Sequence, residues 1–139
     1  MLRLFFDSSA LYAAVLSPSG AAYAILQHAA RDKVQVVISQ DVIAEVERNL
    51  ERKAPELASV LTTLLHETIF EVVSSPPQDE VWAAEEYVVQ KDAFIVAAAK
   101  HAQVDYLVTF DRKHLIDPPE VAKRSGLKIV TPGDVLEKL

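Results

Sequence analysis

The amino-acid sequence predicts a three-layer α/β/α sandwich, in which helices cover both faces of a mostly parallel central sheet. Short apolar runs alternate along the chain with longer segments whose apolar residues recur at helical spacing. The short runs show little alternation of apolar and polar residues, which is typical of strands that are buried on both faces. Strands separated by helices are normally parallel, so this order predicts a parallel sheet.

The expected elements can be placed by their residue ranges. Apolar runs that end in polar or turn residues predict the strands, at residues 2–6, 34–38, 69–73, 106–110 and 127–131. Cap or proline signals followed by helical spacing predict the helices, at residues 21–31, 41–52, from 55 onward, 79–89, 92–102 and from 132 onward. Loops are expected at residues 17–20, 74–77 and 117–119.

The composition indicates one domain over residues 1–139. Half of the residues are hydrophobic, and a domain near this length buries about 70% of its unfolded surface. We find no linker composition and no internal repeat. The absence of Cys removes disulfides and thiolate metal sites. No apolar run approaches the roughly 20 residues that span a membrane, and no signal peptide is evident, so we expect a cytoplasmic protein with no membrane contact.

The acids Asp7, Glu45, Asp92 and Asp111 come from four separate segments. Asp7 and Asp111 end predicted strands, Asp92 opens a helix, and Glu45 flanks the apolar stripe in the second turn of another helix. Strands of an open parallel sheet end at one edge, where the following helices begin and where ligands bind. The four carboxylates are therefore expected at that edge.

Other acids are expected elsewhere. Asp32 and Asp105 precede strands, which places them at the opposite edge. Glu47 and Glu51 point away from the apolar stripe of their helix and are expected in solvent.

Four clustered acids need a counter-charge. Two carboxylates about 4 Å apart repel by roughly 4 kcal/mol at an effective dielectric near 20. Oxygen ligands without Cys or His favour Mg²⁺ or Mn²⁺ over zinc, and one or two such ions suit the hydrolysis of a phosphodiester. The net charge of −6 argues against binding nucleic acid through phosphates alone, but acids gathered around a cation do not exclude a phosphate-bearing substrate.

The order Asp7-Ser8-Ser9, Glu45, Asp92 and Thr109-Phe110-Asp111 resembles the PIN domain family. The resemblance covers essentially the whole chain. Members of this family are metal-dependent ribonucleases and include toxins of toxin–antitoxin pairs. The resemblance thus implies an RNA endonuclease and makes an antitoxin partner possible.

The resemblance also implies roles for single residues. Asp7, Asp92 and Asp111 would be the principal metal ligands, Glu45 would bind directly or through water, and Ser9 and Thr109 would orient ligands or waters. The chain departs from many relatives at one turn, where Gln103 and Val104 stand in place of Gly-Ala.

Basic residues near the acids are candidates for contacts with RNA phosphates, namely Arg48, Lys91, Arg112 and Lys113. His114 is expected at the surface and not as a catalytic base. The other histidines are scattered, so no zinc site is predicted.

Each acid also has a purely structural interpretation. Asp92 suits a helix N-cap, Asp111 an Asx-turn, Asp7 the polar end of a strand, and Glu45 a solvated helix position. Two other protein classes remain open. One is a non-catalytic PIN-like module that binds RNA or protein. The other is a receiver-like signalling domain, which would need an acid after the third strand, where the sequence has serines and prolines.

The apolar residues Leu57, Leu61, Leu64 and Leu65, together with Trp82, exceed what one small sheet obviously needs, so a homodimer is plausible. Trp82 is expected in the core or in an interface.

Overall fold

The computed structural model describes residues 1–139 and contains a five-stranded sheet in the order β3-β2-β1-β4-β5. All neighbouring strands are parallel. The strands are β1 (Leu2–Phe6), β2 (Val34–Ser39), β3 (Phe70–Val73), β4 (Tyr106–Val108) and β5 (Ile129–Val130). The chain builds outward from β1 to β3 and then returns to the other side of β1 with β4. The carboxyl ends of β1 and β4 therefore lie at the point where the strand order reverses, which is the usual ligand position in such sheets.

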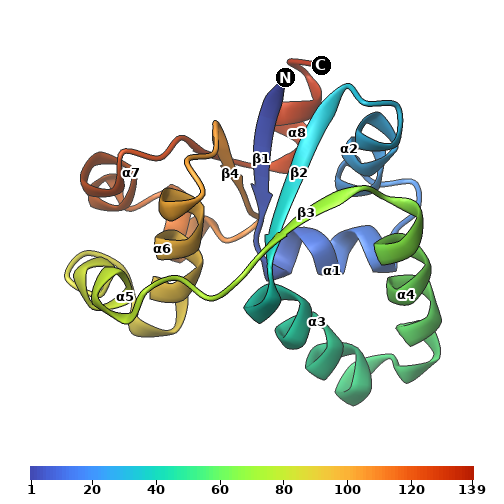
Figure 1. The fold of residues 1–139 in the computed structure, drawn as a ribbon, viewed down its shortest axis with the longest axis horizontal. Helices are drawn as coiled ribbons and strands as arrows, with labels where there is room; N and C mark the ends of the chain where they lie inside the picture. The colour runs from blue at the N-terminus through green and yellow to red at the C-terminus, as the bar shows by residue number, and fades with distance from the viewer.

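Helices cover both faces of this sheet, so the predicted three-layer fold is confirmed. In Figure 1, α5, α6 and α7 lie to the left of the sheet, while α1, α2, α3 and α4 lie to the right. The α-helices are α1 (Ser8–Leu16), α2 (Ala21–Ala30), α3 (Gln40–Lys53), α4 (Ala58–Glu67), α5 (Gln78–Ala84), α6 (Ala93–His101), α7 (Pro119–Ser125) and α8 (Pro132–Leu136). The short turns are η1 (Pro55–Leu57), η2 (Gln90–Asp92) and the π-type turn η3 (Arg112–Ile116).

The core centres on β1, whose Leu4, Phe5 and Phe6 are fully buried. Burying a Leu or Phe side chain stabilises a fold by about 1.5–3 kcal/mol. The alanines of α6 are buried as well, and their small size lets the helix approach the sheet closely. One cluster of 35 buried hydrophobic residues extends from Leu4 to Val135, so the strand that ends at Asp7 and the helix that follows Asp92 share one rigid support.

Two helices differ from the sequence prediction. Residues 8–16 form α1, where only a turn was expected after the first strand. Apolar residues lie on all sides of this helix, with Leu11 and Val15 buried and with Tyr12 partly buried and Leu16 exposed, so its sequence lacks the one-sided apolar stripe that marks a surface helix. Residues 119–125 form α7, where no helix was predicted and a loop was expected only at residues 117–119, and Gly126, whose φ of 78° suits glycine, caps the end of this helix.

Some elements are also shorter than predicted. The predicted helix over residues 79–89 ends at Ala84, and the predicted strand over residues 106–110 ends at Val108. The backbone N–H of Thr109 still donates to the carbonyl of Val130 at 2.9 Å, whereas the side chain of Thr109 and the backbone N–H of Asp111 make other contacts at this edge.

The apolar residues that suggested a homodimer are used in different ways. Leu61 and Leu64 are buried in the core, and Leu57 and Leu65 pack against it. Trp82, which was expected in the core or an interface, is 63% exposed. Most of the predicted surplus of apolar surface is therefore covered within the chain.

No single helix is long and apolar enough to cross a membrane. Helices α1 and α2 satisfy such a test only when taken together, and they meet at an angle of 92°.

Candidate functional site

Asp7 is held at the carboxyl end of β1 by a dense set of hydrogen bonds. It is the N-cap residue of α1, and its Oδ1 accepts the backbone N–H of Ala10 at 2.9 Å and the hydroxyl of Ser9 at 2.7 Å. Its Oδ2 accepts the hydroxyl of Thr109. The residue is only 5% exposed. The structural interpretation of Asp7 as a polar strand end therefore holds, with the added role of a helix cap.

Burial raises the pKa of Asp7 to about 6. The hydrogen bonds from Thr109, Ser9 and the Ala10 N–H oppose this rise, because they stabilise the ionised carboxylate. The negative charge of Asp92 adds to it. Asp7 thus lies close enough to Asp92 for their charges to repel.

Ser9 and Thr109 join the ends of β1 and β4. The Ser9 hydroxyl also accepts the backbone N–H of Phe110 at 3.0 Å, and the Thr109 hydroxyl accepts the backbone N–H of Asp111 at 2.9 Å. Both side chains therefore hold Asp7 on one side and the segment that leads to Asp111 on the other.

Asp92 lies in the middle of the acidic residues. It precedes α6, but its side chain makes no capping hydrogen bond, so the N-cap interpretation of this side chain is wrong. Its Oδ2 is buried and has no hydrogen-bond partner. Buried carboxylate oxygens are normally paired, because an unpaired one loses its hydration without compensation. This oxygen is therefore available to a ligand.

The pKa of Asp92 is affected by the charges of other predicted acids. Burial raises its pKa, the adjacent Lys91 lowers it, and the charges of Asp111 and Glu45 raise it further. Asp92 also acts on Asp7. The structure thus brings Asp7, Glu45 and Asp111 each into electrostatic range of Asp92, at the edge that the parallel topology predicted.

Asp111 follows β4 and caps the π-type turn η3. Its Oδ1 accepts the backbone N–H of His114 at 3.0 Å, which agrees with the Asx-turn interpretation. Its Oδ2 lies 3.3 Å from Nδ1 of His114, and the same nitrogen lies 3.9 Å from Oδ2 of Asp92. The expected surface position of His114 is met only in part, because η3 folds its partly exposed ring back onto the acids.

Glu45 borders a hollow beside the acids. This hollow lies between the first half of α3, the loop after β3 and the start of α6, and its lining includes Glu45, Arg48 and Phe94. Glu47 and Glu51 are exposed, as predicted. The apolar stripe of α3 therefore turns Glu45 toward the site and leaves its acidic neighbours in solvent.

The other basic candidates lie around this edge. Lys91 is exposed but close enough to lower the pKa of Asp92. Arg112 and Lys113 are exposed on η3. The charge of Arg112 also acts on Asp134 in α8, so Arg112 lies within electrostatic range of that helix.

The excluded acids lie at the other edge. Oδ2 of Asp105 accepts the backbone N–H of Arg3 at 2.7 Å, at the amino end of β1. Asp32 precedes β2 in a turn with a φ of 57°. Neither belongs to the site.

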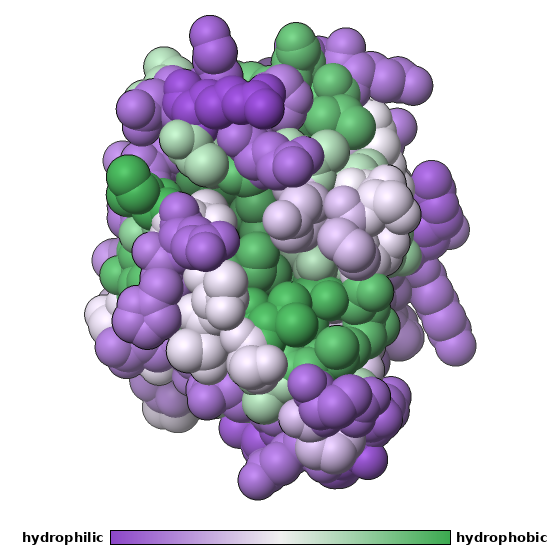
Figure 2. All heavy atoms as spheres, turned by 90° about the vertical axis from the view of Figure 1, so that its right-hand side faces the viewer, coloured by the Kyte–Doolittle hydropathy of each residue, from purple (hydrophilic) through white to green (hydrophobic).

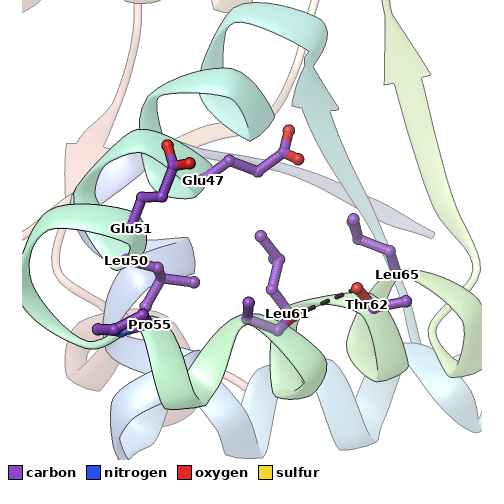
Figure 3. A pocket seen from close by; sticks show the side chains of 8 residues that line it. Glu47, Leu50, Glu51, Pro55, Leu61, Thr62 and Leu65 are labelled. Carbon is purple, nitrogen blue, oxygen red and sulfur yellow. Dashed lines mark hydrogen bonds between the residues drawn. The ribbon is translucent and has the colours of Figure 1, made fainter.

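A separate hollow lies between α3 and α4 (Figure 3). Glu47 and Glu51 project over its apolar floor, to which Leu50, Leu61 and Leu65 contribute. None of the predicted site residues lines it.

The residues at the carboxyl edge fit a divalent cation. Ligand atoms of Asp92, Asp111 and His114 lie within 4.8 Å of one another, and the buried Oδ2 of Asp92 lacks a partner. Carboxylate oxygens suit Mg²⁺ and Mn²⁺, and one imidazole is compatible with Mn²⁺. The chain is thus an α/β protein with an acidic site where its strand order reverses.

Sequence comparison identifies the family of this α/β protein. A family model described as PIN domain matches residues 3–113, and the chain therefore belongs to the PIN domain family. This confirms the resemblance seen in the sequence. A search of curated proteins found no match.

Solved structures support the same fold. PAE2754 from Pyrobaculum aerophilum is 24% identical with a TM-score of 0.67, and the alignment covers 99% of this chain and 94% of that one. VapBC2 from Rickettsia felis, in a structure bound to a DNA fragment from its promoter, is 18% identical with a TM-score of 0.70. The alignment covers 94% of this chain and 98% of that one. VapC20 from Mycobacterium tuberculosis, a sarcin–ricin loop cleaving toxin, is 19% identical with a TM-score of 0.57 over 79% and 91%.

Proposed function

We propose that residues 1–139 form one PIN domain that acts in the cytoplasm as a metal-dependent endoribonuclease, the toxin of a toxin–antitoxin pair. The observation that carries the proposal is the surroundings of Asp92. Its Oδ2 is buried without a partner, and the charges of Asp7, Glu45 and Asp111 all lie within its range. Such a cluster is unfavourable unless protons or a cation balance it.

Asp7, Asp92 and Asp111 would hold the cation, and Glu45 would bind it directly or through a water. When bound, one or two Mg²⁺ or Mn²⁺ ions activate a water and stabilise the leaving oxygen of a phosphodiester. Ser9 and Thr109 keep the carboxylate of Asp7 in a single orientation through their hydroxyl groups. Their role is to position Asp7, since both of its oxygens already accept hydrogen bonds from them.

The hollow beside Glu45 supports an approach for RNA to this site. Arg48 on its rim offers a positive charge to a phosphate, and the ring of Phe94 offers a surface on which a base can stack. Lys91, Arg112 and Lys113 would add phosphate contacts from the other side. The cation and these basic groups together would offset the net charge of −6.

An apolar surface away from the acidic site supports the binding of a protein partner. Figure 2 shows apolar residues gathered on the face that carries α2 and α4. A hollow between α1, α2 and α4 lies there, and Leu16, Tyr23 and Val60 contribute to its lining. We assign this surface, named here the α1–α2–α4 hollow, to an antitoxin protein, since structural relatives are described as VapBC bound to DNA from their promoter. A second copy of the chain is the competing occupant.

The test is cleavage of single-stranded and structured RNA by purified protein with Mg²⁺ or Mn²⁺, or with EDTA. We expect metal-dependent cleavage that the Asp7→Asn/Asp92→Asn double variant loses by about 100-fold or more. The matched control is Asp79→Asn/Asp117→Asn, which removes two exposed carboxylates and should cleave like the wild type. Circular dichroism establishes that all the variants are folded.

Equal behaviour of the wild type and the Asp7/Asp92 variant, together with no Mn²⁺ binding in calorimetry, would refute the nuclease proposal. The chain would then be a non-catalytic PIN-like module that binds RNA or protein.

A further inference from the structure

His114 contributes the one nitrogen in the group of three candidate metal ligands that it forms with Asp92 and Asp111. Its ring comes from η3, and its backbone N–H is tied to Oδ1 of Asp111 at 3.0 Å. The side chain is 27% exposed. The carboxylate of Asp111 therefore holds His114 at the site through two contacts, one to its backbone N–H and one to Nδ1 of its ring.

The distances suit a shared cation. Nδ1 of His114 lies 3.3 Å from Oδ2 of Asp111 and 3.9 Å from Oδ2 of Asp92. Bonds from divalent ions of this class to nitrogen and oxygen are about 2.0–2.2 Å long, so two ligands of one ion lie at most about 4.4 Å apart. Both distances fall within this limit.

The hydrogen bonding of these atoms also supports a shared cation. Oδ2 of Asp92 is buried and accepts no hydrogen bond, although the ring nitrogen of His114 is its neighbour. At 3.9 Å the two atoms are too far apart for a hydrogen bond. An ion between them would satisfy both.

We propose that Nδ1 of His114 is a metal ligand alongside Asp92 and Asp111, and that it makes the site select Mn²⁺ over Mg²⁺. This inference rests on the proposed metal site and adds its selectivity. Mg²⁺ binds oxygen ligands and keeps much of its water, whereas imidazole strengthens the binding of first-row transition ions. The competing arrangement is a ring that only donates a hydrogen bond to Asp111 and leaves the ion with oxygen ligands alone.

This selectivity predicts that substitution of His114 lowers the affinity for Mn²⁺ more than the affinity for Mg²⁺. Replacing His114 by Ala removes the nitrogen, so the affinity for Mn²⁺ should fall about tenfold or more, while the affinity for Mg²⁺ should change less than about threefold. His114→Gln is a second variant, which keeps a polar side chain of similar reach. His101→Ala is the matched control, because His101 is exposed at the far end of α6, where it pairs with Glu80.

The experiment measures Mn²⁺ and Mg²⁺ binding by calorimetry in the four proteins and records pulsed electron paramagnetic resonance of bound Mn²⁺. A directly bound imidazole couples its ¹⁴N nucleus to Mn²⁺, and we expect this coupling in the wild type and in His101→Ala but not in the His114 variants. Mn²⁺ binding without nitrogen coupling, or with unchanged affinity in both His114 variants, would overturn the His114 assignment and leave the acidic site standing. No Mn²⁺ binding by the wild type would overturn both.

Discussion

The hydroxyl of Thr109 donates a hydrogen bond to Oδ2 of Asp7, which lies 102 residues earlier in the chain. The same oxygen atom of Thr109 accepts the backbone N–H of Asp111 at 2.9 Å. Thr109 is completely buried, so no water can replace its hydroxyl. One side chain therefore links two proposed metal ligands from the ends of β1 and β4.

Thr109→Val keeps the shape of the side chain but removes this link. We expect the free energy of unfolding to fall by about 2–3 kcal/mol at neutral pH, because Oδ2 of Asp7 and the Asp111 N–H are left without their partners. Thr109→Ser keeps the hydroxyl and loses one methyl group, so it should cost only about 1 kcal/mol. Urea denaturation measures both values. Equal losses in the two variants would assign the stabilisation to methyl packing instead.

Asp7→Asn should change how stability depends on pH. The pKa of Asp7 is raised from 3.8 to about 6 in the folded protein, so the folded state binds more protons than the unfolded state between these values. Stability is therefore lost as the pH rises through this window. The shift corresponds to about 3 kcal/mol.

In the absence of metal, the stability of the Asn variant relative to wild type should rise by about 2–3 kcal/mol between pH 4 and pH 7. Urea denaturation in EDTA, with Asp79→Asn as the control, measures this difference. A difference that stays constant with pH would show that Asp7 has an ordinary pKa.

Gln103→Gly should stabilise the protein. Gln103 has a φ of 55°, a left-handed conformation that costs a non-glycine residue roughly 1–2 kcal/mol. Glycine loses part of this gain through its more flexible unfolded state, so we expect a net increase of about 0.5–1 kcal/mol in the free energy of unfolding. Asp32→Gly, at a φ of 57°, is the comparison and should gain less, since Asp tolerates this region better. A destabilised Gln103→Gly variant would contradict the account.

Arg48→Ala should weaken RNA binding more than catalysis. Arg48 lines the hollow beside Glu45, so its loss removes a phosphate contact made before and during the reaction. We expect KM to rise about fivefold to tenfold with little change in kcat. Arg52→Ala is the control, because Arg52 lies one turn further along α3 and bonds to Asn49. Equal effects of the two variants would indicate a general charge effect and not a contact.

Leu16→Glu should disrupt the proposed partner surface without unfolding the chain. Leu16 is 46% exposed on the lining of the α1–α2–α4 hollow. Co-expression with the proposed antitoxin protein should yield a complex with the wild type and much less with the variant. Light scattering of the isolated proteins is the second measurement. A dimer that the substitution dissociates would assign the hollow to a second copy of the chain.

The sequence by itself determined the layered architecture and the edge at which the acids meet. The apolar runs before Asp7 and Asp111 predicted buried strands, and their alternation with helices predicted parallel pairing. Parallel strands end at one edge, so the approximate position of Asp92 and Glu45 followed from the order of elements alone. The turn at Gln103 was also visible as a departure from the family pattern, because it occupies a position that favours glycine.

Only the tertiary structure decided the features that depend on contacts between distant segments. Helix α1 buries one side but has apolar residues on all sides, so its sequence carries no amphipathic stripe. The ring of His114 reaches the acids because a π-type turn folds it back, and three residues of spacing from Asp111 do not distinguish this turn from an exposed loop. Oδ2 of Asp92 lacks a hydrogen-bond partner because of how distant segments pack around it. The local sequence pattern predicts instead that an Asp at this position caps the helix. Spacing along the chain determines which edge a side chain approaches, whereas burial and neighbouring charges determine what it can bind there.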